Sequence, residues 1–331
     1  MTSDALEYSI VVPTYQRRGQ LARSLRAIEA LKFPWHRFEI VVVDDGSPVP
    51  PADLMASLDA SLDARLVCAD HGGPAAARNA AARVARGRHL VFTDDDCAPR
   101  RDWLQAIDRC IAPLGSSTAI GGHTVNVLAD NPYATASQGI VDFLYGYFGD
   151  HAAPRQFFTS NNLVMPRDGF MAIGGFDESF QLAAAEDRDL CERWQAAGGQ
   201  LRFAPDVIVD HAHVLDFARF NRQHFNYGRG AFDLHRSRAS RGNTSLRLEP
   251  ARFYFGLITY PIRRTGGWRS GPLALLHFWS QVAYAAGYFF ERGRRGWALQ
   301  PRVQAMTGAR DSRPRPGSAD RTDQGSMTGA A

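Results

Sequence analysis

Short apolar runs alternate with helical patterns through the first hundred residues, and this alternation leaves few possible folds. The apolar runs are rich in β-branched residues and are predicted strands, at residues 8–13, 38–43, 65–68 and 89–93. The segments between them have helical patterns, at residues 20–31, 53–62 and 74–85. Strand–helix alternation predicts βαβ units. We therefore expect an α/β fold with a mainly parallel central sheet and helices on both faces.

Polar clusters follow three of the predicted strands. They are PTYQR at residues 13–17, DDGSP at residues 44–48 and DDDCAP at residues 94–99. In open parallel sheets, ligands bind beyond the carboxyl ends of the strands. We therefore expect the three clusters to meet in one crevice, which is the predicted functional site.

The next hundred residues are less regular. A strand is predicted at residues 120–127, a helix followed by a loop at residues 131–149, and a strand interrupted by polar side chains at residues 157–165. Residues 186–197 have a helical pattern that ends at two glycines. Two short strands are predicted after them, at residues 201–203 and 207–209.

The composition changes after Val214. The chain becomes rich in arginine and aromatic residues with helical spacing, and residues 300–331 have few apolar side chains, which predicts disorder. We therefore expect an α/β domain at residues 1–214, a basic and aromatic helical region at residues 215–299, and a disordered tail at residues 300–331.

Residues 272–290 (PLALLHFWSQVAYAAGYFF) are about as long as a membrane span but contain polar side chains, and the basic segment ERGRRG follows them. Three interpretations stay open: a spanning helix, a helix that lies on the membrane, or a helix packed against protein. The N-terminus lacks the basic and apolar regions of a signal peptide. We expect a cytoplasmic protein, peripheral to the inner face of the cell membrane.

The overall composition is that of a globular protein, with 45% hydrophobic and 22% charged residues. The net charge of +4 is uneven, since residues 219–315 are rich in arginine and poor in acids. Such a surface suits the phosphates of lipids or nucleotides. No nucleic-acid partner is expected, because no nucleic-acid-binding motif occurs. The four cysteines are scattered and predict neither a zinc site nor a disulfide framework.

Three consecutive aspartates, Asp94, Asp95 and Asp96, follow the predicted strand at residues 89–93. Their carboxylates repel one another, so their place at a strand end calls for a positive partner. Mg²⁺ or Mn²⁺ binds carboxylate oxygens, usually one or two of them together with substrate phosphates. The alternative is a solvated acidic turn that caps a helix beginning near Arg100. The position in the βα array favours the metal.

Two further segments suit a nucleoside diphosphate. Asp44 follows a buried strand and can accept hydrogen bonds from a ribose or a base, although it is also consistent with a turn. In HGGPAAARN, Gly72 and Gly73 lie at a helix start, where free N–H groups favour anions, and Arg78 lies one turn further on. The same segment is also consistent with a turn alone.

Seven motifs in this order resemble those of the family 2 glycosyltransferases, which have the GT-A fold. The motifs are SIVVPTYQR, VVVDDGS, GGPAAARN, FTDDDCAP, GGFDESF, EDRDLCERW and VIVDHAH, within residues 8–213. The resemblance implies an inverting transfer of a sugar from a nucleoside-diphosphate sugar to a glycan or lipid-linked acceptor, with Mn²⁺ or Mg²⁺ as cofactor. It implies a role in the synthesis of cell-surface polysaccharide or glycolipid.

The resemblance also implies roles for individual residues. Asp96 is the implied metal ligand, together with Asp94 and His211, and His213 is the alternative to His211 because both side chains of an extended HAH segment lie on one face. Contact with the nucleotide sugar is implied or expected for Pro13, Thr14, Tyr15, Arg17, Asp44, Gly73, Arg78, Asp94 and Asp95.

Glu186 and Asp187 are the expected catalytic pair, and the resemblance implies that Asp187 is the base. Acids at a helix start gain about 0.3–1 kcal/mol each from the helix dipole, which suffices to explain Glu186 and Asp189. A sugar transfer needs, in addition, a base that takes the proton of the acceptor hydroxyl. Direct attack on one face inverts the anomeric carbon, so one carboxylate suffices.

The acceptor contacts are the least constrained part of the prediction. Asn161 and Asn162 can hydrogen-bond sugar hydroxyls, and Trp194 can stack on a sugar ring. Each of the three is equally consistent with packing or with a turn.

Two rival functions stay open. A sugar-phosphate nucleotidyltransferase also uses a metal, a nucleotide and an α/β sheet, but it normally opens with a Gly-rich loop where this chain has VVPTYQRR. A non-catalytic subunit that retains the fold is the second rival, and the intact DDD and ED motifs argue against it.

Overall fold

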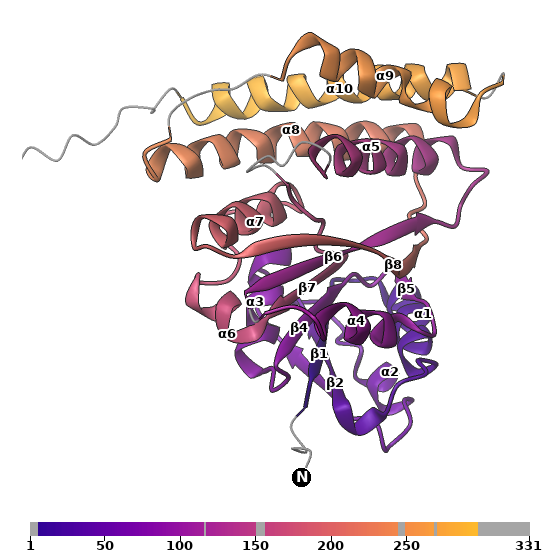
Figure 1. The fold of residues 1–331 in the computed structure, drawn as a ribbon, viewed down its shortest axis with the longest axis vertical. Coiled ribbons are helices and arrows are strands. Elements are labelled where there is room, and N and C mark those ends of the chain that lie inside the picture. The colour runs from indigo at the N-terminus through magenta and orange to yellow at the C-terminus, as the bar shows by residue number, and fades with distance from the viewer. Residues whose placement is uncertain (1–5, 116, 150–155, 244–248, 268–269, 297–331) are drawn as a thin grey trace, which may run out of the picture. The chain divides into compact units, whose positions relative to one another are not determined.

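The computed structural model describes residues 6–115, 117–149, 156–243, 249–267 and 270–296. At the centre of these residues is one eight-stranded sheet with the order β3-β2-β1-β4-β7-β6-β8-β5 (Figure 1). Its strands are β1 (Tyr8–Thr14), β2 (Phe38–Asp44), β3 (Ala64–Cys68), β4 (His89–Thr93), β5 (Cys97–Pro99), β6 (Thr118–Asn126), β7 (Asn162–Pro166) and β8 (Gln200–His211).

The predicted fold class is confirmed. Parallel pairing joins β3, β2, β1 and β4, as the alternation predicts, and also joins β6 to β8. The sheet is mixed beyond β4, because β7 is antiparallel to β4 and β6, and β5 is antiparallel to β8. The two short strands predicted after residue 200 are one strand, β8, whose register against β6 shifts between Gly122 and His123.

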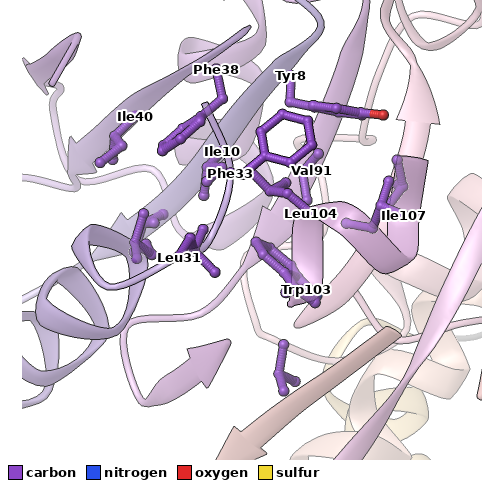
Figure 2. Packing of buried hydrophobic residues seen from close by; sticks show 14 of the residues in the cluster. Tyr8, Ile10, Leu31, Phe33, Phe38, Ile40, Val91, Trp103, Leu104 and Ile107 are labelled. Atoms are coloured by element: carbon purple, nitrogen blue, oxygen red, sulfur yellow. The ribbon is translucent and has the colours of Figure 1, made fainter. Parts of the chain in front are cut away.

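Helices cover both faces of the sheet (Figure 1). They are α1 (Arg18–Glu29), the 3-10 helix η1 (Trp35–Arg37), α2 (Ala52–Ala56), α3 (Pro74–Val84), α4 (Trp103–Ile111), α5 (Pro132–Gly149), α6 (Arg167–Ala172), α7 (Glu186–Ala196), α8 (Phe217–Ser240), α9 (Ala251–Thr265) and α10 (Ser270–Arg294). Successive side chains of β1 point to opposite faces of the sheet. Ile10 packs in the cluster with α1 and α4 (Figure 2), and Val11 packs in the cluster with α3 and α6.

Two helices differ in extent from the prediction. α2 ends at Ala56 instead of residue 62, because the Asp59 carboxylate accepts the N–H of Ser61 in a local turn. α5 is helical through Gly149, where a helix followed by a loop was expected. Its aromatic side chains pack against α9, with the rings of Phe143 and Phe253 5.4 Å apart between centroids.

α8 and α10 cross at close range because each has a glycine at the contact. A Cβ atom on Gly228 would lie 1.8 Å from the carbonyl oxygen of Tyr284, and one on Gly287 would lie 1.9 Å from that of Phe225. Arg229 of α8 also donates to the buried Glu291 of α10 at 2.8 Å. The two helices are therefore held by backbone packing and by a buried ion pair.

α8 also holds the helix that carries the predicted catalytic pair. Asp189 of α7 is buried and accepts hydrogen bonds from Ser237 at 2.9 Å and from Arg241 at 2.7 Å. By contacts, residues up to Leu299 form one compact unit. The boundary at residue 214 remains a prediction, and the tail at residues 300–331 lies outside the described residues.

The stretch at residues 272–290 lies within α10. In the described part of the chain, no helix has both the length and the apolar character that crossing a bilayer requires.

Candidate active site

The carboxyl ends of β1, β2 and β4 meet, as the polar clusters predict. Thr14, the last residue of β1, is in register with Asp44, the last residue of β2. The Thr14 hydroxyl donates to Asp95 Oδ2 at 2.7 Å, just beyond the end of β4. Pro13 precedes Thr14 in β1, and the exposed ring of Tyr15 stacks on His71 with centroids 4.3 Å apart.

A small hollow lies beside these strand ends. It is lined by Thr14, Gln16, Arg17, Arg18, Leu21, Asp44, Ser47, Val49 and Pro51. Asp44 is buried, and its Oδ2 atom accepts the N–H of Ser47 at 3.0 Å. Its Oδ1 atom has no hydrogen-bond partner among the described residues. Because a buried acceptor without a donor is costly, this oxygen suits a ligand that brings an N–H or O–H group.

Asp94 and Asp95 have separate cationic partners. Asp94 Oδ1 accepts from Arg78 at 2.7 Å, and Asp95 Oδ1 accepts from Arg17 at 3.3 Å. Burial raises the pKa of Asp95 to about 7, although Arg17 and the Thr14 hydroxyl act in the opposite direction. The triplet therefore faces the protein's own arginines as well as the crevice.

Asp96 and His211 form the group that fits a divalent cation. His211 Nε2 lies 3.2 Å from Asp96 Oδ1, and the ligand atoms of Asp96, Cys97 and His211 lie within 4.8 Å of one another. Burial acts to raise the pKa of Asp96, but the hydrogen bond from His211 holds it at about 2. Burial also keeps Cys97 a neutral thiol, because it raises the pKa of that group. The Asp96 carboxylate suits Mn²⁺ or Mg²⁺, and the His211 imidazole can serve as a further ligand of a divalent transition metal.

The other two predicted metal ligands lie at the margin of this group. Asp94 is paired with Arg78, and His213 stacks obliquely against His211 with ring centroids 5.2 Å apart. Burial lowers the pKa of His213 to about 4, so its imidazole is neutral at physiological pH. The choice between His211 and His213 remains a prediction, and the contact with Asp96 favours His211.

Arg78 connects the acidic triplet to the predicted catalytic helix. Its guanidinium group donates to Asp94 at 2.7 Å and to Glu186 Oε1 at 3.2 Å, and it lies over the ring of Phe176. The side chain is buried, and its Nε atom has no partner in the described chain. One arginine thus places the DDD and ED motifs side by side. Its nucleotide contact stays a prediction.

Glu186 and Asp187 begin α7 directly after a strained residue. Ala185 has a left-handed backbone with φ 72° and ψ 0°, which costs an L-residue about 1–3 kcal/mol and recurs at functional sites. Burial raises the pKa of both carboxyl groups, and for Glu186 the charge of Asp187 adds to this effect while Arg78 opposes it. The N–H of Arg188 donates to Asp187 Oδ1 at 2.7 Å. A raised pKa suits a group that accepts a proton.

The N–H groups of Gly72 and Gly73, just before the start of α3, are not free for a ligand. The N–H groups of Gly72 and Gly73 donate to Asp45 at 2.9 and 3.0 Å. The protein's own carboxylate therefore occupies the place that the sequence suggested for a phosphate, and a nucleotide contact by Gly73 does not fit.

Two of the predicted acceptor residues are core residues. Trp194 is 4% exposed and donates its Nε1 hydrogen to the carbonyl of Gln200 at 2.8 Å. Asn162 is 1% exposed, donates to two backbone carbonyls and accepts from Trp103 at 3.0 Å. A sugar contact does not fit either position, because these side chains are buried and their polar atoms are already paired.

Asn161 and an unpredicted tyrosine, Tyr227, are the remaining polar candidates for an acceptor contact. Asn161 is half-buried and accepts from the Thr159 hydroxyl at 2.8 Å. Tyr227 of α8 has a raised pKa, chiefly through burial, with a contribution from the charge of Asp187. Sequence reasoning missed Tyr227, because a single aromatic residue in a helix carries no sign of which side chains its hydroxyl will meet.

The mixed α/β fold, the acidic strand end and the carboxylate pair at the start of α7 agree with the class of glycosyltransferases. The family model "Glycosyl transferase family 2" matches residues 9–176, which is 168 of the 331 residues, and the chain belongs to this family. The glycosyltransferase AglE of Haloferax volcanii is 26% identical over 236 residues, 71% of this chain and 76% of the relative.

A second relative, the pre-mycofactocin glycosyltransferase of Mycobacterium tuberculosis, is 28% identical over 69% of this chain, and the match covers only 47% of that relative. A third, the succinoglycan biosynthesis protein ExoM of Rhizobium meliloti, is 27% identical over 63% of this chain and 68% of the relative. This chain thus spans between about half and three quarters of these three relatives.

Solved glycosyltransferases share the fold. The mannosyltransferase PcManGT from Pyrobaculum calidifontis, in complex with GDP-Man and Mn²⁺, superposes with a TM-score of 0.56 at 20% identity, over 88% of this chain and 76% of that one. TarS 1–349 of S. aureus, in complex with UDP-GlcNAc, has a TM-score of 0.52 at 16% identity, over 88% of this chain and 92% of that one. The protein is a glycosyltransferase with the GT-A fold.

Proposed function

We propose that this glycosyltransferase moves a sugar, with inversion, from a nucleoside-diphosphate sugar to a hydroxyl of a glycan or lipid-linked acceptor. The observation that carries the proposal is the pairing of Arg78 with both Asp94 and Glu186, at 2.7 and 3.2 Å. It brings the acidic strand end and the carboxylate pair into one site. Similar folds bind GDP-Man with Mn²⁺ and UDP-GlcNAc, which supports a nucleotide-sugar donor.

The nucleotide part of the donor would lie at the ends of β1 and β2. The unpartnered Asp44 Oδ1 is the acceptor for a ribose or base donor, and Thr14 and Arg17 fix Asp95 beside it. The exposed ring of Tyr15 provides an apolar surface next to this hollow. Donor recognition would thus use side chains that the sheet already holds in place.

Asp96 and His211 would hold Mn²⁺ or Mg²⁺. When bound, the cation supplies positive charge that stabilises a leaving diphosphate. The Asp96 carboxylate raises the pKa of His211, although burial acts in the opposite direction. Because a cation binds the neutral imidazole, acidic pH would weaken its binding.

Asp187 would act as the base. Its carboxylate takes the proton of the acceptor hydroxyl while the hydroxyl oxygen bonds to the anomeric carbon and the bond from that carbon to the diphosphate breaks. The attack occurs opposite the leaving group, so the product is inverted and no second carboxylate is needed. Glu186 would position Arg78, because it accepts a hydrogen bond from the guanidinium group of Arg78. Asn161 and Tyr227 are the remaining candidates for an acceptor contact.

The proposed setting is the assembly of cell-surface polysaccharide or glycolipid at the cytoplasmic side of the cell membrane. The relative named for succinoglycan biosynthesis supports the polysaccharide setting.

The test is a panel of UDP-, GDP- and dTDP-sugars incubated with Mn²⁺ and candidate acceptors. Release of the nucleoside diphosphate and the mass of the glycosylated product are measured for the wild type and for Asp187→Asn. Asp168→Asn is the matched control, because this aspartate is fully exposed on α6. We expect product from the wild type and the control but not from Asp187→Asn. Pyrophosphate release from a nucleoside triphosphate and a sugar phosphate would instead indicate the nucleotidyltransferase, and equal product from Asp187→Asn would contradict the proposed base.

A further inference from the structure

α10 has its polar side chains on the inside and its apolar side chains on the outside. His277, Ser280 and Glu291 are buried. The His277 Nδ1 atom contacts the carbonyl oxygen of Leu257 at 2.8 Å, and Glu291 accepts from Arg229 of α8. An ordinary surface helix has the opposite arrangement, with its charged and polar residues facing water.

The outward side of α10 is a continuous apolar stripe, which we name the α10 face. It consists of Leu275, Phe278, Trp279, Val282, Phe289 and Phe290, with Ala285 and Ala286 between them. Leu275 is 66% exposed and Phe289 62%. The positions recur every three or four residues, so they lie along one side of the helix. No Asp, Glu, Lys or Arg occurs from Ser270 to Phe290.

Arginines flank both ends of the α10 face. α9 packs beside α10 (Figure 1), and the last turn of α9 contains Arg263 and Arg264. The last turn of α10 contains Arg292 and Arg294. Arg294 pairs with Glu291 and Arg264 pairs with Asp142 at 3.4 Å, so arginines outnumber acids at both ends although part of their charge is neutralised. α9 also exposes Phe255 and Ile262. The α10 face is therefore an apolar strip between two basic ends.

We propose that the α10 face lies on the surface of a lipid bilayer that contains anionic lipids. Large apolar side chains along one side of a helix enter the boundary between headgroups and acyl chains, and flanking arginines meet the phosphates. The basic flanks favour an anionic lipid surface over a neutral apolar partner. The inference is independent of the proposed sugar transfer, because it rests on α9 and α10 alone.

The test is sedimentation of the full-length protein with vesicles of phosphatidylcholine alone and with vesicles that also contain phosphatidylglycerol. The variant Phe278→Glu/Phe289→Glu places two charges on the α10 face. Met171→Glu is the matched control, because Met171 is 43% exposed on α6, within the α/β part of the chain. Since all three side chains are exposed, we expect unchanged thermal unfolding, which verifies that each variant is folded.

We expect the wild type and Met171→Glu to sediment with the anionic vesicles more than with the neutral ones. We expect the double variant to bind at least about tenfold more weakly, and added salt to weaken wild-type binding. Absence of binding to anionic vesicles, or equal binding by the double variant, would overturn the proposal. So would a dimer in sedimentation velocity that the double variant abolishes, since a second copy of the chain would then cover the α10 face.

Discussion

At the scale of single residues, the site holds charges that burial disfavours. Glu186 is buried and Asp187 half-buried, both carboxyl groups have raised pKa values, and burial raises the pKa of Asp95 to about 7. Ala185 adds backbone strain at the start of the same helix. Such costs persist where they serve function, which agrees with a base that must hold a proton for part of each cycle.

Replacement of Asp187 by Asn tests this account of the base. General-base catalysis contributes about 10²–10⁴-fold, so we expect kcat/KM to fall by that range. Because the pKa of Asp187 is raised in the folded state, its ionised form at neutral pH lowers stability. We therefore expect the melting temperature of Asp187→Asn to equal or exceed that of the wild type. A lower melting temperature together with the lost activity would point to a structural role instead.

The pH dependence of the reaction follows from the same shift. Asp187 must be ionised to accept a proton, and its pKa lies above the usual value of about 3.9. As the pH falls, kcat/KM should therefore decline at a higher pH than an ordinary aspartate would cause. The measurement is kcat/KM against pH at saturating Mn²⁺, repeated at a tenfold higher concentration to separate loss of the metal. A profile that is flat down to pH 4 is inconsistent with Asp187 as the base.

At the scale of elements, glycine placement determines how closely α8 and α10 approach. Gly228 faces the carbonyl of Tyr284 across the crossing, whereas Gly146 on α5 has open space where a Cβ atom would lie. The two positions are both helical glycines but differ in what a methyl group would meet. The crossing therefore depends on Gly228 itself and not on helix propensity.

We expect Gly228→Ala and Gly146→Ala to change stability in opposite directions. Overpacking at Gly228 should lower the free energy of unfolding by about 1–3 kcal/mol. At Gly146 the gain in helix propensity should raise it by about 0.5–1 kcal/mol. Urea unfolding of both variants measures the two changes. A stabilising effect at Gly228 would mean that the two helices are further apart than described.

The elements also show how far sequence reasoning reaches. The four strands of residues 8–93 and the meeting of their polar ends were predictable, because β-branched runs and βαβ handedness leave little freedom. β5 was not predicted, and β8 was predicted as two strands. The burial of Trp194 and Asn162 was not predictable, because it depends on residues distant in sequence. Trp103, for example, donates a hydrogen bond to Asn162. The capping of the Gly73 helix start by Asp45 likewise depends on tertiary neighbours. For α10, the sequence showed a long apolar stretch at residues 272–290. It did not show which side of the helix would be exposed.

At the scale of the whole molecule, the C-terminal helices are part of the compact unit that carries the site. Asp189 on α7 is fully buried, and if the chain stops before α8 it loses Ser237 and Arg241 and keeps Arg193 of its own helix. Breaking buried ion pairs in this way is strongly destabilising. The α/β part of the chain and the helical part therefore depend on each other.

A chain that ends at Val214 should consequently lose its cooperative thermal unfolding. A chain that ends at Leu299 is the control, and it should unfold like the full-length protein. Differential scanning calorimetry of the three forms makes the comparison. Cooperative unfolding of the Val214 form would show instead that residues 1–214 are an independent domain.

The most direct test of the central claim is calorimetric titration of UDP, GDP and dTDP into the protein with and without Mn²⁺. If Asp96 and His211 hold the cation beside the nucleotide, one of the three nucleoside diphosphates should bind much more tightly in the presence of Mn²⁺ than in its absence. Asp96→Asn should abolish this gain, and Asp187→Asn should retain it. Equally tight binding in EDTA, or an unchanged Mn²⁺ effect in Asp96→Asn, would contradict the account.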